Sequence, residues 1–172
     1  MQTKQPTSPI SLPPILRHTK AHRLLASMAG GLMNLVFFLK DMFPLKPSSR
    51  TRVIILNEEA SHILLVRNIA PPLTWKLPGG GCHRQENKYE CAIRELKEEL
   101  AITIQASSLQ ALPDSLSLEK SRQYFVTRIK QPSVQIKLSL ELIDAAWYSL
   151  TDLPLRCSKE TKNVIKWLLL NN

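Results

Sequence analysis

Residues 79–102, with the sequence GGGCHRQENKYECAIRELKEELAI, decide the fold of this 172-residue chain. The three glycines predict a loop whose backbone can approach another group closely, because no side chain stands in the way. Apolar residues then recur at helical spacing, so we expect a helix from about Asn87 to Leu100. On a wheel of about 100° per residue, its core face consists of Tyr89, Ile93, Leu96 and Leu100.

Three glutamates lie on another face of this helix, roughly 130° from the core face. Glu95, Glu98 and Glu99 are three and four positions apart, and such like charges repel by roughly a few tenths of a kcal/mol per pair. A solvated acidic face, partly neutralised by Arg94 and Lys97, is one interpretation. The glycine loop favours another, because oxygen ligands beside such a loop suit Mg²⁺, which bridges to substrate phosphates.

Residues 80–102 resemble the Nudix box, the family pattern G-x5-E-x7-R-E-U-x-E-E-x-G-U in which U is a bulky apolar residue. Eight of its nine defined positions are filled in register, by Gly80, Glu86, Arg94, Glu95, Leu96, Glu98, Glu99 and Ile102. Ala101 stands where the family has a glycine that usually caps the helix in the left-handed conformation. We therefore expect Ala101 to destabilise the domain by about 1 kcal/mol relative to glycine, or the turn to take a different shape. Gln85 also stands where relatives often have glycine, and it is expected to alter the entry of the loop.

The resemblance extends more weakly over about 51–172 and implies an α/β fold. This is the Nudix-type α/β/α sandwich with a mixed β-sheet, here preceded by an apolar or amphipathic N-terminal helix. Short apolar runs at Val53–Leu56 and Ile63–Val66 predict paired strands. Further strands are expected at Tyr124–Ile129 and Ala145–Tyr148, and a closing helix at Thr161–Leu170.

The resemblance also implies a reaction, the hydrolysis of a diphosphate bond in a nucleoside diphosphate linked to another group. Mg²⁺ or Mn²⁺ would be bound by Glu95, Glu98, Glu99 and the Gly80 carbonyl. Arg94 would steady Glu86 and Glu95, the other members of the catalytic set; a surface salt bridge to Glu98 is the alternative. The general base stays open between Glu95 and a loop glutamate such as Glu141.

Five residues are candidates for binding the nucleotide-like substrate: Gly79, Gly80, Arg67, Trp75 and Lys76. Trp75 could equally be part of the core. The box specifies the reaction and leaves the substrate unspecified. A second class of function is a non-catalytic Nudix module that binds a nucleotide or a partner, also at a membrane surface; the intact carboxylate set argues against it.

The three cysteines are Cys82, Cys91 and Cys157. Their odd number and the lack of a C-x-x-C pair predict reduced thiols rather than a disulfide framework, and hence a cytoplasmic protein. A zinc site using Cys82 and His83 is disfavoured, because no second ligand pair stands at zinc spacing.

The net charge of +9 is concentrated near the N-terminus, where residues 1–52 carry eight Lys or Arg and one acid. We expect a disordered Pro-rich tail over 1–19, a basic helix and linker over 20–50, and the Nudix hydrolase domain over 51–172. The helical segment 20–42 could pack on the domain or a partner, lie on an anionic membrane surface at its inner face, or span a membrane. Its uncharged stretch, 24–39, is shorter than the roughly 20 residues of a typical span. No specific nucleic-acid motif is present.

Overall fold

The computed structural model describes residues 49–113, 121–130 and 136–171. The predicted tail over 1–19 and most of the predicted helix and linker over 20–50 lie outside these residues. The described part contains no helix that is long and apolar enough to cross a membrane.

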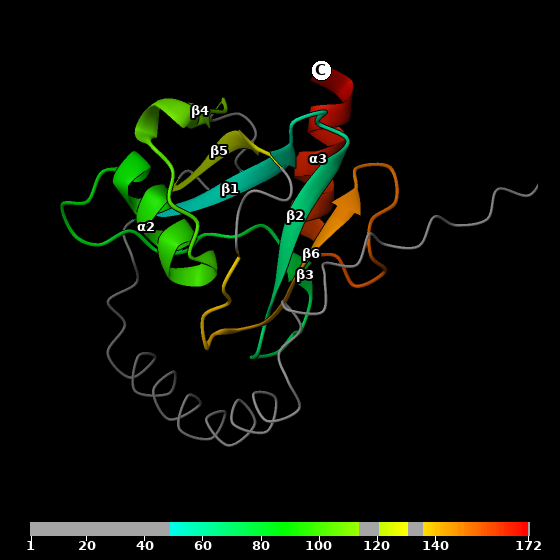
Figure 1. Cartoon of the computed structure of the whole chain (residues 1–172), viewed down its shortest axis with the longest axis horizontal. Coiled ribbons are helices and arrows are strands. Elements are labelled where there is room, and N and C mark those ends of the chain that lie inside the picture. Colours follow the sequence, from blue (N-terminus) through cyan, green and yellow to red (C-terminus); the bar gives the residue numbers. More distant parts are fainter. Residues whose placement is uncertain (1–48, 114–120, 131–135, 172) are drawn as a thin grey trace, which may run out of the picture.

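In the described residues, six strands form one mixed β-sheet (Figure 1). In chain order they are β1 (Arg50–Asn57), β2 (His62–Asn68), β3 (Trp75–Lys76), β4 (Gln110–Ala111), β5 (Arg122–Ile129) and β6 (Leu142–Ser149). The strand order is β3-β2-β1-β5-β4, and β6, which lies off this path, pairs with β2. Only β1 and β5 run parallel, over eight residue pairs, whereas the other pairings are antiparallel.

Helices cover the two faces of the sheet, α2 (Lys88–Leu100) on one and α3 (Lys159–Asn171) on the other (Figure 1). Neighbouring strand residues point to opposite faces, so Val53 packs in the cluster that contains Leu96 of α2. Ile54 packs in the cluster that contains Ile165 of α3. Both faces of β1 are therefore buried, which explains its unbroken apolar run and confirms the α/β/α sandwich.

β1 and β2 diverge, and the glycine loop fills the space between them. Their only paired residues are Leu56 and Ile63. Farther along β1, the N–H groups of Val53 and Thr51 donate to the carbonyls of Pro78 and Gly80, each at 3.0 Å. The loop thus takes the place of a strand partner, and its glycines are held against β1.

The start of α2 agrees with the sequence-based expectation. Asn87 is the N-cap, and it forms a capping box with Glu90 in which each side chain accepts from the other's backbone N–H. Such a box satisfies donors that the first helical turn would otherwise leave unpaired.

The core face of α2 is broader than predicted and rotated toward Cys91. Cys91 and Ala92 are fully buried, whereas Tyr89 is 39% exposed although its ring packs on Phe125. The helical-wheel prediction assumed a single buried face, whereas α2 packs against the sheet on one side and against the glycine loop on an adjacent side. The short elements β4 and η2 (Ala106–Ser108) were not predicted, because two or three residues carry no periodicity.

Candidate active site

Gly79 and Gly80 bring the backbone of the loop into contact with α2 and β1. Gly79 has φ +119°, and a Cβ there would lie 2.5 Å from the Thr51 carbonyl oxygen. A Cβ on Gly80 would lie 2.6 Å from both carboxylate oxygens of Glu95. A side chain at Gly79 would therefore displace the loop from β1, and one at Gly80 would move the Glu95 carboxylate away from the loop.

Glu99 is the most deeply buried of the three helix carboxylates, at 7% exposure. Its Oε2 accepts a hydrogen bond of 2.8 Å from the Gly79 N–H. Burial raises the pKa of Glu99 to about 7, although that hydrogen bond and the charge of Lys76 act in the other direction. The neighbouring groups of the protein thus offset only part of the negative charge of ionised Glu99.

Glu95 and Glu98 stand on either side of the boundary between the interior and solvent. The Glu95 side chain is 13% exposed and that of Glu98 is 59% exposed. Burial raises the pKa of Glu95, with Arg94 opposing. The face of α2 that the three glutamates share therefore extends from the buried Glu99 to the exposed Glu98.

Arg94 links these groups to the loop. Its Nε and Nη2 donate to the two oxygens of Glu86, at 2.8 and 3.0 Å. Its Nη1 donates to Glu95 at 3.0 Å and to Glu98 at 2.9 Å, and Nη2 also reaches the Gly81 carbonyl at 2.9 Å. Arg94 thus contacts Glu86 and Glu95, as predicted, and also forms the salt bridge to Glu98 that was the alternative. The hydrogen bonds from Arg94 lower the pKa of Glu86.

The donor set fits a hard divalent cation. Glu99 is buried and Glu95 is half-buried; the two carboxylates repel each other, and burial raises the pKa of both. A nearby cation would balance the negative charge that the surrounding side chains do not neutralise. All the donors are oxygens, as Mg²⁺ and Mn²⁺ prefer.

The predicted substrate residues divide between the two faces of the sheet. Lys76 pairs with Val66, whose side chain belongs to the α2 side, whereas Trp75 pairs with Arg67. Opposed residues of an antiparallel pair share a face, so Lys76 points toward the carboxylates, while Arg67 and Trp75 point to the α3 side. The structure therefore separates Lys76 from Trp75 and Arg67, and substrate binding by any of the three stays a prediction.

Trp75 and Arg67 are also engaged with other groups. Trp75 is 8% exposed in the core cluster on the α3 side and meets Tyr148 edge to face at 5.0 Å between ring centroids. Arg67 lies over the Trp75 ring at 5.1 Å and forms a 3.2 Å salt bridge with Asp144. The burial of Trp75 favours its interpretation as a core residue.

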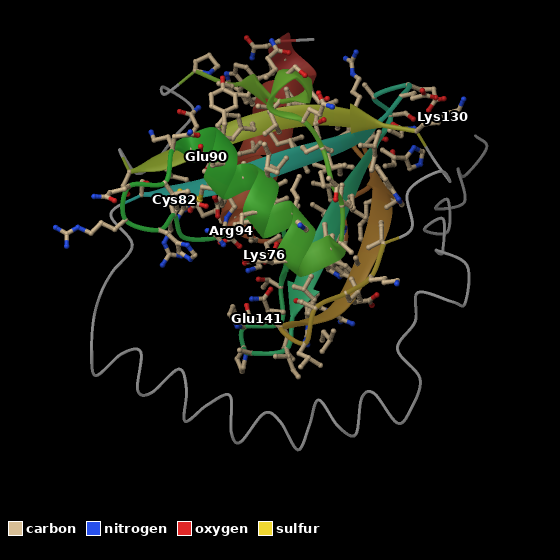
Figure 2. The ribbon with its side chains drawn as sticks, turned by 60° about the vertical axis from the view of Figure 1, so that its left-hand side comes forward. Lys76, Cys82, Glu90, Arg94, Lys130 and Glu141 are labelled. Atoms are coloured by element: carbon tan, nitrogen blue, oxygen red, sulfur yellow. A yellow bond between two sulfur atoms is a disulfide. The ribbon has the colours of Figure 1, made fainter. Side chains whose placement is uncertain are left out.

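Lys76 is the candidate substrate residue that lies beside the acids. Burial lowers its pKa, against the attraction of Glu99 and Glu141. Figure 2 shows Lys76 between Arg94 and Glu141 in that view. Glu141 is exposed, and its backbone carbonyl accepts from Ile69 N–H at 2.9 Å at the start of β6.

Cys82 and Cys91 form a disulfide, so the expectation of reduced thiols is wrong for this pair. The loop turns back on the first part of α2 and brings their Cα atoms to 5.2 Å, a separation suited to a disulfide. Cysteine count and spacing could not show this return of the chain. Cys157 is a buried free thiol.

A metal site at Cys82, Glu86 and Cys91 is disfavoured, although their ligand atoms lie within 4.8 Å of one another. The two sulfurs are bonded to each other. Both Glu86 oxygens accept from Arg94. The side chain of His83 belongs to no such group in the described part of the chain.

Sequence reasoning missed Arg52, which reaches the glycine loop from β1. Its Nη1 donates to the Gly79 carbonyl, and its residue exposure is 7%. The available signal was a charged residue at the start of the apolar run Val53–Leu56, because a buried charge requires a partner.

Comparison with known proteins places this fold and site in a family. Residues 46–168 match the NUDIX domain. Nudix hydrolase 8 of Arabidopsis thaliana is 30% identical over 121 residues, which are 65% of this chain and 32% of that protein. The chain thus spans about a third of the length of this curated relative. The chain belongs to the Nudix family.

Two solved structures illustrate the shared fold. An Ap4A hydrolase of C. elegans, in a binary complex, is 21% identical with a TM-score of 0.57, covering 72% of this chain and 96% of its own. A putative Nudix hydrolase family member from Chromobacterium violaceum is 25% identical with a TM-score of 0.57, covering 75% and 81%.

Proposed function

We propose that this chain hydrolyses a diphosphate bond in a nucleoside diphosphate linked to another group, and that it requires Mg²⁺ or Mn²⁺. One observation carries the proposal: the buried Glu99 and the half-buried Glu95 both lie beside the glycine loop, where burial raises the pKa of both carboxyl groups. Arg94 and the Gly79 N–H offset only part of the cost of this burial, whereas a bound cation would offset more of it. Membership in the Nudix family supports the same reaction.

Each residue has a role in this proposal. Glu95, Glu98, Glu99 and the Gly80 carbonyl would hold the cation, which activates water and offsets the charge of the phosphates when bound. Arg94 keeps Glu95 and Glu98 near each other while it pairs with Glu86. Fixed ligands of this kind need little rearrangement during the reaction.

Lys76 is the residue that we assign to the substrate phosphates. It lies on the same face of the sheet as Glu99, and the Coulombic attraction between the two keeps its ammonium group close to the acids. In the hydrolysis, a water oxygen bonds to one phosphorus, the bridging P–O bond breaks, and the water proton passes to a base. Glu95 and the exposed Glu141 are the two candidates for that base.

The Cys82–Cys91 disulfide bears on the subcellular location of the protein. The expectation of a cytoplasmic protein rested on reduced cysteines, but Cys82 and Cys91 are bonded to each other. The charge of the residues before β1 still supports an anionic membrane surface as a partner.

The test is a panel of nucleoside diphosphates linked to sugars, nucleotides or alcohols, incubated with the full chain and Mg²⁺. Ion-exchange chromatography of the products should show two phosphate-containing fragments from at least one substrate, and EDTA should abolish them. A folded protein that binds members of the panel with Mg²⁺ present and cleaves none would instead be the non-catalytic module.

A further inference from the structure

A buried arginine joins the glycine loop to the helix on the opposite face of the sheet. Arg52 lies on β1 and its side chain is 9% exposed. Its Nη1 donates to the Gly79 carbonyl, and its Nε lies 3.7 Å from Oε1 of Glu160 on α3. Arg52 thus hydrogen-bonds the Gly79 carbonyl and faces Glu160 as an ion pair, in which its buried Nε forms no hydrogen bond. The rigid planar fork of the guanidinium lets one side chain contact both groups.

Gly79 is held from both sides by charged groups. Its carbonyl accepts from Arg52, and its N–H donates to Glu99 at 2.8 Å. The Gly79 carbonyl belongs to the peptide group that joins Gly79 to Gly80. Arg52 therefore restrains the plane of this peptide, immediately before the carbonyl that we assign to the cation.

Glu160 is itself fixed by β5. Its Oε1 accepts from the Tyr124 hydroxyl at 2.9 Å and lies 2.8 Å from Nη1 of Arg122. The carboxylate is thus held by two residues of the neighbouring strand, which leaves it little freedom to leave Arg52. A continuous polar path leads from α3 through Arg52 and Gly79 to Glu99.

We infer that Arg52 is a positioning residue for the metal centre. It orients the Gly79–Gly80 peptide so that the Gly80 carbonyl and the Glu99 carboxylate act on the same cation, and Glu160 holds Arg52 in place. This inference rests on the proposed function and extends it to residues outside the Nudix box. The competing interpretation is a buried ion pair that only stabilises the fold.

Binding of Mn²⁺ to the full chain without substrate separates the two interpretations. The free Mn²⁺ signal in electron paramagnetic resonance gives the affinity, and a thermal melt of each sample reports folding. The variants are Arg52→Lys, Arg52→Met and Glu160→Gln. Arg128→Met on β5 is the matched control, because it removes one positive charge from an exposed strand residue.

We expect Arg52→Lys to weaken Mn²⁺ binding about tenfold, since a compact ammonium keeps the charge but cannot reproduce the fork. Arg52→Met should weaken it at least as much, and Glu160→Gln less, in the same direction. In turnover with Mg²⁺, kcat should fall while KM for the nucleotide changes little. Arg128→Met should bind Mn²⁺ like the unchanged protein.

Two results would overturn the inference. One is a folded Arg52→Lys protein with unchanged Mn²⁺ affinity and kcat, which would leave Arg52 a stabilising ion pair. If Arg52→Met does not fold, the Mn²⁺ affinities of Arg52→Lys and Glu160→Gln, measured below their melting temperatures, distinguish the two interpretations. The other is a folded, unchanged protein that binds no Mn²⁺, which refutes the proposed function itself and this inference with it.

Discussion

At Gly80, the missing side chain lets both oxygens of Glu95 lie against the backbone, where a Cβ would meet them at 2.6 Å. The sequence predicted this acidic group because the spacing of the glutamates brings them together on any helix. It could not predict Arg52 or the bond between Cys82 and Cys91. Those contacts depend on where β1 and the loop lie relative to α2, which local spacing does not encode.

Glu99 gives a prediction at the scale of one residue. Its pKa in the folded protein is about 7, against an ordinary value of 4.5. Between these values the folded protein keeps a proton that the unfolded chain has lost. The metal-free protein should therefore lose stability as pH rises from about 4.5 to 7, by at most about 3 kcal/mol.

Urea unfolding at several pH values in EDTA measures this loss. Glu99→Gln should reduce the slope and leave the part that comes from Glu95, whose pKa burial also raises. Saturating Mg²⁺ should remove the slope, because the cation stabilises the ionised carboxylates. The lowered pKa of Glu86 acts in the opposite sense, but its contribution lies below the ordinary value of 4.5 and outside this window. An equal slope in Glu99→Gln would show that other groups cause the pH dependence.

Among the elements, β3 shows how register decides which residues can meet. Trp75 and Lys76 are neighbours on a strand, and neighbours point to opposite faces. This alternation alone is enough to separate the two side chains wherever the strand lies. Which of them faces the acids depends on the partner strand, because only the pairing of Lys76 with Val66 identifies that side.

The end of α2 confirms one of the two expectations for Ala101. Ala101 adopts the left-handed conformation, with φ 56° and ψ 24°, and its N–H donates to the carbonyls of Leu96 and Lys97. The turn therefore keeps the family's shape without the family's glycine. Gln85, the other residue that stands where the family often has glycine, also adopts a left-handed conformation, with φ 72°.

Replacement of this residue tests the cost of the left-handed cap. Ala101→Gly should stabilise the domain by up to about 1 kcal/mol, because glycine adopts this conformation without a Cβ penalty. Chemical unfolding gives the difference directly. Ala106→Gly, at an exposed alanine that has no positive φ, should give no such gain. Destabilisation by Ala101→Gly would mean that the methyl group contributes more than the strain costs.

At the scale of the whole molecule, the catalytic domain and the basic N-terminal segment have separable roles in our account. The domain boundary near residue 51 stays a prediction. A shortened chain that begins at Lys46 keeps every described strand and helix, so it should fold and retain hydrolysis of soluble substrates. Residues 1–45, which the shortened chain lacks, carry five Lys or Arg and one acid, and this excess of +4 should direct the full chain to anionic lipid, less so at high salt.

Flotation with vesicles containing an anionic phospholipid, at low and high salt, measures this lipid binding. Only the full chain should float, and replacing Arg17, Lys20 and Arg23 with Gln should weaken its binding. If neither form floats and the shortened chain unfolds, the segment belongs to the core of the domain and the boundary is wrong.

In the proposed reaction, the carboxylates of α2 and the cation they would hold direct water to a phosphorus of a diphosphate bond. The most direct test is hydrolysis of an active panel substrate in ¹⁸O-labelled water with Mg²⁺, followed by mass spectrometry of both products. We predict that one phosphate product carries the label, and that Glu98→Gln and Glu99→Gln each lower its formation by orders of magnitude while melting normally. Label in neither phosphate product, or an unchanged rate in a folded Glu99→Gln protein, would contradict the account.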